Sequence, residues 1–300
     1  MTHIAAITSA ETLATLRAVV ANETRLAVKC EDRFAKAFVR TKNRILASVL
    51  PQALLKKVFD TAAPGSYCFT IARTRHFDEA LLAACRSGVQ QVVLLGAGYD
   101  SRAFRFKDAL AGVTIFEVDH PGTQARKQRI LQASFGKLPA NLHYAPVDFT
   151  RDSLEAALLR NGFVRNRRTL FLWEGVSYYL PERAVQNVLD FVASCAPGSS
   201  IMFDYAIRSF VDGNASTYGG EQVANWLKRI GEPFLFGLDP AETSAFLAAR
   251  KMRVLSDLGP EELEKRYLDM KDGTSLGRTL GHVRIVHAQA QPPNLQTRII

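Results

Sequence analysis

The fold is decided by the stretch Gln91-Val92-Val93-Leu94-Leu95-Gly96-Ala97-Gly98-Tyr99-Asp100-Ser101-Arg102. An apolar run of strand length ends in a Gly-x-Gly turn, and a helical pattern begins at Arg102. Doubly wound α/β domains use this strand–turn–helix unit to bring their backbone close to a nucleotide-like cofactor. The stretch therefore predicts such a domain, although Gly96 and Gly98 alone would also suit an ordinary turn from strand to helix.

Two departures from the dinucleotide pattern Gly-x-Gly-x-x-Gly indicate which cofactor the turn suits. Ser101 replaces the third glycine, and Asp100 stands where the helix should open. A carboxylate there would oppose a pyrophosphate docking on the positive end of the helix. S-adenosylmethionine (SAM) carries a sulfonium and an ammonium group instead, so the turn favours a methyltransferase over a nicotinamide-dependent oxidoreductase.

Apolar and polar segments alternate along the rest of the chain in the pattern of a mostly parallel sheet covered by helices on both faces. Strands are expected at residues 91–95, 113–118, 142–147, 169–173, 199–205, 252–256 and 282–288. Helices are expected at 102–110, 121–134, 152–160, 181–195, 221–230, 240–249 and 260–268. Before the glycine turn, residues 11–60 predict three or four helices with a break at Pro51, and 74–86 predict another.

Composition places the chain among ordinary globular proteins. Its 300 residues are 47% hydrophobic and 22% charged, with no apolar run long enough to span a bilayer and no signal-peptide pattern at the start. The four cysteines are scattered without a Cys-x-x-Cys pair, so we expect reduced thiols in a cytoplasmic protein and no metal site.

The net charge of +9 has two interpretations, attraction to nucleic acid or a solvated basic surface. The main basic cluster is formed by Arg165, Arg167 and Arg168, and no aromatic side chains are interleaved with it. Because base stacking needs such aromatics, the basic surface is the preferred interpretation. We expect neither a nucleic-acid nor a membrane partner.

Acidic residues recur where the predicted strands end, at Asp119, Asp148, Glu174 and Asp204. Ligands of open α/β sheets bind outside these carboxyl ends. Asp119 follows the glycine turn by about twenty residues, which suits the two ribose hydroxyls. Asp148, next to the aromatic Phe149, could hold an adenine amino group. Each acid could instead cap the next helix, but four of them on one rim favour a pocket for a neutral or cationic nucleoside.

Several ordered motifs resemble the leucine carboxyl methyltransferase family of SAM-dependent methyltransferases, specifically its bacterial members. They are Arg73-Thr74-Arg75 with Phe77-Asp78, the run at 94–102, Phe116-Glu117-Val118-Asp119-His120-Pro121, Val147-Asp148-Phe149, Trp173 to Leu180, and Gly231 to Gly237 with Phe246-Leu247. The resemblance covers roughly residues 25–290. It implies a seven-stranded class I methyltransferase sheet, an N-terminal helical cap over residues 1–72, and a SAM-dependent domain over 73–300 with a lid-like insertion near 206–237.

The resemblance also implies a role for individual residues. Arg73 would pair with the carboxylate of the methionine moiety, and Gly96 and Gly98 would let the backbone approach the cofactor. Glu174 would lie near the methionine amino group and the reacting methyl. The remaining contacts would come from Asp119 to the ribose, from Asp148 and Phe149 to the adenine, and from a further N-terminal cation, for which Arg25 is the candidate.

The acceptor is less defined than the cofactor. Bacterial relatives point to O-methylation of a carboxylate or hydroxyl on a small molecule; the alternatives are a protein C-terminal carboxylate, as in eukaryotic members, an RNA-directed protein, or a SAM-fold protein without activity. A hydroxyl acceptor would need a group that takes its proton, and Tyr178, Tyr205 and His120 are the candidates. Aromatic walls of an acceptor pocket are expected from Tyr218, Trp226, Phe234 and Phe236.

Overall fold

The computed structural model describes residues 3–39 and 49–291. Its N-terminal part is helical, as predicted, and the part of the prediction that falls on residues 40–48 lies outside the described residues. The elements are α1 (His3–Val20), the 3-10 helix η1 (Arg33–Phe38), α3 (Gln52–Ala62) and α4 (Ser66–Arg86). Pro51 stands directly before α3, as expected from the break it imposes. The division expected at 72/73 falls inside α4.

The strands form one mixed sheet whose order along the main path is β3-β2-β1-β4-β5-β8-β7. They are β1 (Gln91–Leu95), β2 (Thr114–Asp119), β3 (Leu142–Pro146), β4 (Thr169–Trp173), β5 (Ser200–Ile207), β7 (Met252–Leu258) and β8 (Val283–Ala290). Only β8 runs antiparallel to its neighbours, β5 and β7. All seven predicted strands are present, and an eighth, β6 (Gly237–Leu238), pairs with the end of β5.

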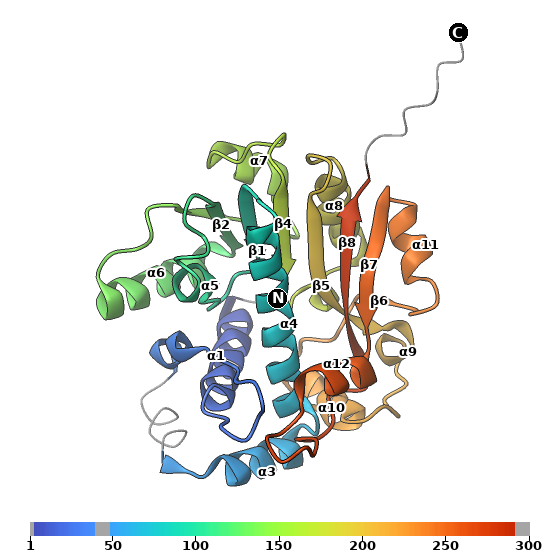
Figure 1. The fold of residues 1–300 in the computed structure, drawn as a ribbon. Helices are drawn as coiled ribbons and strands as arrows, with labels where there is room; N and C mark the ends of the chain where they lie inside the picture. The colour runs from blue at the N-terminus through green and yellow to red at the C-terminus, as the bar shows by residue number, and fades with distance from the viewer. Residues whose placement is uncertain (1–2, 40–48, 292–300) are drawn as a thin grey trace.

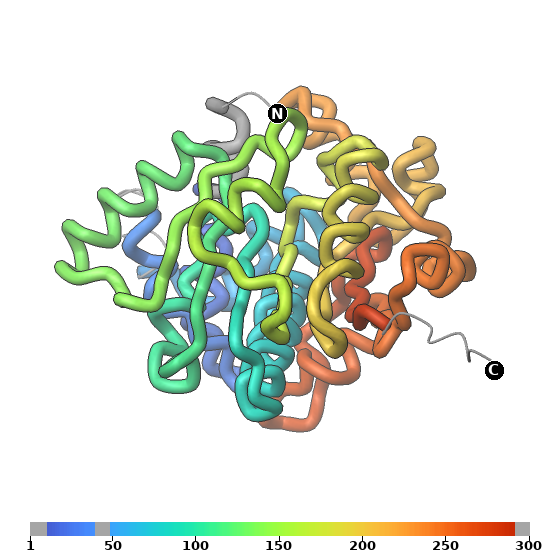
Figure 2. The backbone as a smooth tube through the Cα atoms, turned by 90° about the horizontal axis from the view of Figure 1, so that it is seen from above, coloured from blue at the N-terminus to red at the C-terminus, as the bar shows by residue number. Residues whose placement is uncertain are grey.

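Helices cover both faces of this sheet (Figures 1 and 2). The helices that follow β1 in the chain are α5 (Arg102–Arg105), α6 (Pro121–Phe135), α7 (Leu154–Arg160), η2 (Ser177–Tyr179), α8 (Glu182–Ala193), α9 (Arg208–Val211), α10 (Gly220–Ile230), α11 (Thr243–Ala248) and α12 (Pro260–Tyr267). The helix expected at 102–110 is wrong in length, because the chain leaves α5 after Arg105 and continues in hydrogen-bonded turns as far as Val113.

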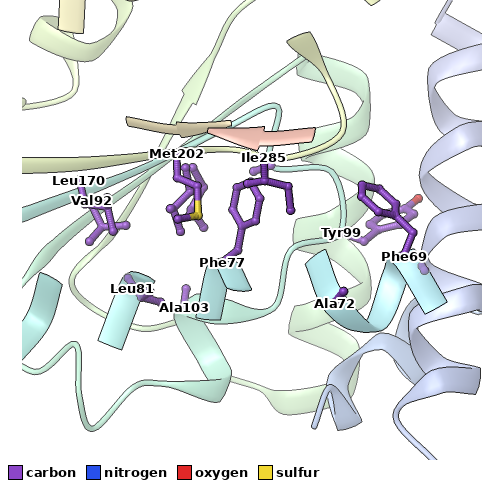
Figure 3. Packing of buried hydrophobic residues seen from close by; sticks show 14 of the residues in the cluster. Phe69, Ala72, Phe77, Leu81, Val92, Tyr99, Ala103, Leu170, Met202 and Ile285 are labelled. Carbon is purple, nitrogen blue, oxygen red and sulfur yellow. The ribbon is translucent and has the colours of Figure 1, made fainter. Parts of the chain in front are cut away.

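Side chains of β1 alternate between two cores. Val92 and Leu94 pack with α4 and α12 on one face, whereas Val93 and Leu95 pack with α7 and α8 on the other. Figure 3 shows Phe77 of α4 reaching into the first of these cores. Burial on both faces explains why the strand is an uninterrupted apolar run rather than an alternating one.

The site is positioned by the order of the strands. β1 has β2 on one side and β4 on the other, so the chain reverses its direction of winding at β1. A crevice forms at such a switch point, at the carboxyl ends of the strands. Figure 1 shows α1 and α10 at this end of the sheet. Within residues 3–39 and 49–291, no helix combines the length and the apolar character needed to cross a membrane.

Candidate active site

A cavity of about 490 Å³ opens at the carboxyl ends of the parallel strands. Its walls come from the glycine turn, from the residues after β2, β3 and β4, and from α1. Seven of the residues expected to bind the cofactor line this one cavity: Arg73, Gly96, Gly98, Asp119, Asp148, Phe149 and Glu174. Residues far apart in sequence thus meet where the strand order predicts a ligand.

The glycine turn is held in shape by Asp119. Gly96 and Gly98 both have positive φ, at 62° and 43°, where side chains are disfavoured. A Cβ at Gly96 would also collide with the side chain of Val176. The Asp119 carboxylate accepts hydrogen bonds from the backbone N–H groups of Gly98 and His120. Burial raises the pKa of Asp119, and these two N–H groups oppose that rise by stabilising the carboxylate.

Glu174 is held between two guanidinium groups. Its Oε1 lies 3.1 Å from Nε of Arg73, and its Oε2 lies 2.7 Å from Nη1 of Arg102. Burial alone would raise the pKa of Glu174, but the charges of Arg102 and Arg73 outweigh it and hold that pKa below its usual value. Glu174 is therefore a carboxylate at neutral pH, in the wall of the cavity.

Arg73 is almost fully buried and uses only part of its guanidinium within the protein. Besides the pair with Glu174, its Nη1 donates to Oδ2 of Asp204 at 2.8 Å and lies 3.5 Å from the Tyr178 hydroxyl. Asp204 is fixed in turn by the backbone N–H of Gly175, at 2.7 Å. Within the part of the chain that the structure describes, the contacts of the Arg73 guanidinium are made by Nε and Nη1, and Nη2 makes no hydrogen bond, so this nitrogen is available to a ligand in the cavity.

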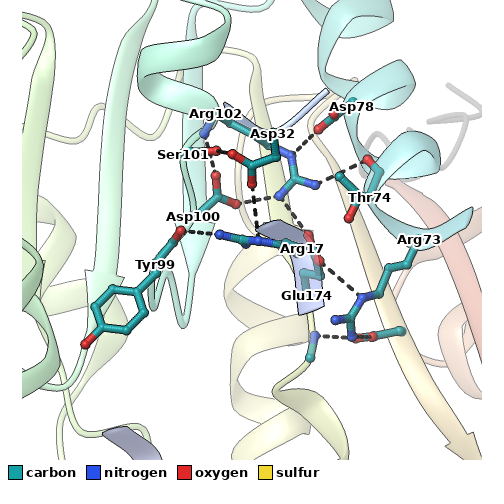
Figure 4. Close-up of polar contacts among 12 residues, drawn as sticks. Arg17, Asp32, Arg73, Thr74, Asp78, Tyr99, Asp100, Ser101, Arg102 and Glu174 are labelled. Atoms are coloured by element: carbon teal, nitrogen blue, oxygen red, sulfur yellow. Dashed lines mark hydrogen bonds and ion pairs between the residues drawn. The ribbon is translucent and has the colours of Figure 1, made fainter. Parts of the chain in front are cut away.

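These groups belong to one connected network of charges (Figure 4). It contains the four guanidinium groups of Arg17, Arg73, Arg102 and Arg105 and the five carboxylates of Asp32, Asp78, Asp100, Glu174 and Asp204. With all of them ionised, one negative charge is in excess, which favours a ligand with a net positive charge.

Asp100 plays a different part from the one its position in the sequence indicated. It lines the cavity, but its carboxylate accepts hydrogen bonds from the backbone N–H and the guanidinium of Arg102. Although burial opposes ionisation, the positive charges around Asp100, with that of Arg102 the strongest, lower its pKa. Much of its charge is thus neutralised by the protein itself, and Glu174 becomes the stronger candidate to face a cationic ligand.

Asp148 and Phe149 lie at the lip of the cavity. Oδ1 of Asp148 accepts hydrogen bonds from the backbone N–H of Thr150 at 2.9 Å and from its hydroxyl at 2.6 Å, and the Asp148 side chain is 32% exposed. The Thr150 hydroxyl is the main cause of its lowered pKa. Asp148 therefore closes its own turn and does not cap α7, whose N-cap is Ser153, so the capping alternative is wrong for this residue. Phe149 offers an aromatic face beside Trp173.

Of the three candidates for proton removal, two line the cavity and one does not. Tyr178 lines the cavity, and burial raises its pKa well above 10. His120 also lines the cavity, where Nδ1 accepts a hydrogen bond from Gly122 at 3.2 Å. Tyr205 is not among the lining residues; its hydroxyl lies 2.8 Å from Asp257 and 3.0 Å from Thr243.

Of the expected acceptor walls, Trp226 lines the cavity, and Phe234 packs against Tyr178 with ring centroids 4.3 Å apart. Phe236 is buried in the core on the other face, and Tyr218 packs under Arg278 away from the lining.

The N-terminal cation also differs from the candidate. Arg25 forms an ion pair with Glu23 and does not line the cavity. The cation that lines it is Arg17 of α1, which donates to the carbonyl of Tyr99 in the glycine turn. The Leu-x-x-Leu-Arg pattern at 13–17 is the sequence signal for it, since it places Arg17 on the helix that covers the turn.

SAM fits this donor set. Its ammonium and sulfonium suit the excess of negative charge and the ionised Glu174, and its carboxylate suits Nη2 of Arg73. Asp119 retains acceptor capacity for ribose hydroxyls beyond its two backbone bonds. Phe149 provides an aromatic surface for a base.

Comparison with known proteins agrees with this fit. The family model for leucine carboxyl methyltransferase matches residues 10–193. The chain is 30% identical, over 72% of its own length and 71% of that protein's, to a Bacillus subtilis protein named "Putative S-adenosyl-L-methionine-dependent methyltransferase YktD". A similarly named Mycolicibacterium smegmatis protein is 38% identical over 55% of this chain, which spans about half of that protein (54%).

Solved structures support the fold. A DUF574 family protein from Streptomyces avermitilis superposes with a TM-score of 0.61 over 93% of this chain and 97% of its own, at 12% identity. A Thermobifida fusca protein described as a "putative methyltransferase" gives 0.57 over 93% and 94%, at 16% identity. The chain thus belongs to the leucine carboxyl methyltransferase family, and it is a SAM-dependent methyltransferase with SAM as its cofactor.

Proposed function

We propose that this methyltransferase esterifies a carboxylate of a small, largely apolar acid that binds in the same cavity as SAM. The proposal rests on one observation: among the described residues, the apolar and aromatic part of the cavity lining contains no side chain suited to taking a proton from a hydroxyl. His120 of the same lining directly follows Asp119, the residue proposed for the ribose. The experiments below test the cofactor site and the acceptor separately.

The cofactor would lie across the rim of the sheet. Asp119 would accept hydrogen bonds from the ribose hydroxyls, and Phe149 would pack on the adenine. Nη2 of Arg73 would hold the methionine carboxylate, with Glu174 beside the ammonium. When bound, SAM supplies an electrophilic methyl group on its sulfonium.

One part of the lining is apolar and aromatic, and suits a compact organic acceptor. It is formed by Leu13, Leu16, Tyr178, Tyr179, Trp226 and Leu235. Within this described set only the two tyrosines titrate, and burial raises the pKa of both, so neither is a base at neutral pH. A carboxylic acid is already ionised there and brings its own nucleophile. A hydroxyl would have to lose its proton first.

What the protein contributes to transfer is position and exclusion of water. Holding the acceptor oxygen in line with the methyl group can account for about 7–11 kcal/mol of the barrier in the best intramolecular cases. The helix α1 supplies one wall through Thr12, Leu13 and Leu16, so the reacting atoms are enclosed between α1 and the sheet. No charged intermediate on the protein is required.

The test is incubation with SAM and a matched panel: aromatic carboxylic acids, their phenol counterparts, and a peptide ending in leucine. We expect methylation of acids, detected by mass spectrometry as gain of one methyl group that mild alkali removes as an ester would. Methyl products resistant to alkali would indicate a hydroxyl acceptor. Methylation of the peptide alone would favour a protein substrate.

A pair of variants separates acceptor from cofactor binding. Trp226→Ala should raise the KM for the acid about tenfold, because a large lining surface is lost, while the Kd for SAM stays near that of the wild type. Tyr218→Ala, which removes an aromatic ring outside the lining, is the matched control and should change neither quantity.

A further inference from the structure

Arg102 connects three carboxylates from three separate segments. It is the first residue of α5, is 2% exposed, and is not among the residues that line the cavity. Its Nε lies 2.8 Å from Asp78 of α4, and its Nη1 contacts both Asp100 of the glycine turn and Glu174 after β4. The ring of Phe77 packs 5.6 Å from the centre of the guanidinium and restricts its movement.

The two arginines that hold Glu174 have different surroundings. Arg73 lines the cavity and keeps Nη2 for a ligand, so its contact with Glu174 can change when a ligand binds. Arg102 lies behind the wall, with its contacts made entirely inside the protein. The orientation of Oε2 of Glu174 therefore depends on Arg102 more than on Arg73.

We infer that Arg102 is the positioning residue of the SAM site: its guanidinium, anchored on Asp78 and Asp100, holds Oε2 of Glu174 through Nη1 and so fixes this carboxylate in the cavity wall, where it faces the cofactor ammonium. Arg102 acts only through Glu174 and touches no ligand. The inference rests on the placement of SAM in the proposed function. It goes beyond that function because a residue outside the cavity controls how well Glu174 binds the ammonium.

Every element around Glu174 contributes a charge to it. Cations come from Arg102 on α5, Arg73 on α4 and Arg17 on α1, and anions from Asp100 in the glycine turn and Asp204 on β5. Without Arg102, two cations remain to balance three carboxylates. Glu174 would then take up a proton more easily, and its neutral form would bind the ammonium poorly. Loss of Arg102 should thus make SAM affinity dependent on pH.

The experiment is calorimetric titration of the whole protein with SAM at about pH 8 and about pH 5.5. Arg102→Met should bind at least about tenfold more weakly than the wild type at the higher pH, with a further loss of about threefold or more at the lower pH. Arg102→Lys keeps the charge but not the fork. It should bind about threefold more weakly than the wild type at both pH values, so that its affinity relative to the wild type does not change with pH.

Arg284→Met is the matched control, because Arg284 forms a partly buried ion pair with Asp257 outside the cavity. It should melt at a lower temperature and bind SAM like the wild type. Thermal melts show which variants are folded. If Arg102→Met does not fold, the test relies on Arg102→Lys. Wild-type affinity at both pH values in the folded Arg102 variants would overturn the inference alone. No SAM binding by the wild type would overturn this inference and the proposed function together.

Discussion

Glu174 and Asp148 each follow a parallel strand and line the same cavity, but their surroundings differ. Glu174, after the central strand β4, is buried between Arg73 and Arg102. Asp148, after the edge strand β3, is partly exposed and bonds mainly to Thr150 in its own turn. The pKa of both is lowered, one by buried guanidinium charge and the other by a local hydroxyl. Both acids stand at strand ends, so we expect their contributions to SAM affinity to differ because one strand is central and the other lies at the edge of the sheet.

The largest effect is expected at the centre of the network, from Arg73→Met. The variant leaves Glu174 and Asp204 without their shared cation, and removing one partner from a buried pair costs about 3–5 kcal/mol. We expect a lower melting temperature without ligand and a loss of SAM affinity of about a hundredfold or more by calorimetry. An unchanged melting temperature would mean that the buried pairs contribute little.

The next largest effect on SAM affinity is expected from Glu174→Gln. The amide keeps the shape of the side chain but removes the negative charge that would face the ammonium, and a charge-assisted hydrogen bond is worth about 1.5–3 kcal/mol. SAM affinity should fall about ten- to a hundredfold. The protein should remain folded by circular dichroism, because Arg102 keeps Asp78 and Asp100 and Arg73 keeps Asp204. Affinity within twofold of the wild type would remove Glu174 from the cofactor site.

Asp119 should set the response to acid. Burial raises the pKa of Asp119, so its carboxylate takes up a proton at a higher pH than that of an exposed aspartate. Since the charged form accepts more hydrogen bonds, SAM affinity should be lost as the pH falls through the pKa of Asp119. Asp119→Asn should bind about tenfold more weakly at neutral pH and show its acid loss at lower pH than the wild type. Calorimetry over a range of pH measures the affinity at neutral pH and the pH at which affinity is lost. If the variant loses affinity at the same pH as the wild type, the loss is caused by a group other than Asp119.

The smallest effect is expected at the edge, from Asp148→Asn. The amide oxygen can still accept from Thr150, and surface substitutions usually change stability by no more than about 0.5 kcal/mol. SAM affinity should fall by less than about threefold in the same titration. If SAM affinity fell as much as in Glu174→Gln, the acids after the central strand and the edge strand would contribute equally, against this expectation.

The sequence predicted the parts of this site that depend on local pattern. Buried strands end in acidic residues at known positions, so Asp119, Asp148 and Glu174 could be placed on one rim. Strand alternation also separates Asp204 from Tyr205, since neighbours in a strand face opposite sides. Because Asp204 points toward Arg73 at the cavity, Tyr205 faces the core on the other side of the sheet.

The ion network could not be predicted in the same way. Asp78, Arg102 and Glu174 come from α4, α5 and the end of β4, and their contacts depend on how these elements pack. The exchange of Arg25 for Arg17 has a similar cause. Helix α1 ends at Val20, and the described residues before α3 that line the cavity all belong to this helix. Arg17 lies within it, whereas Arg25 follows it.

The central claim is that this cavity is built for a cationic nucleoside rather than for a pyrophosphate. Calorimetric titration of the wild-type protein with SAM and, separately, with NAD tests it most directly. We expect micromolar binding of SAM and no heat from NAD. Binding of NAD, or the absence of SAM binding by the folded protein, would contradict it.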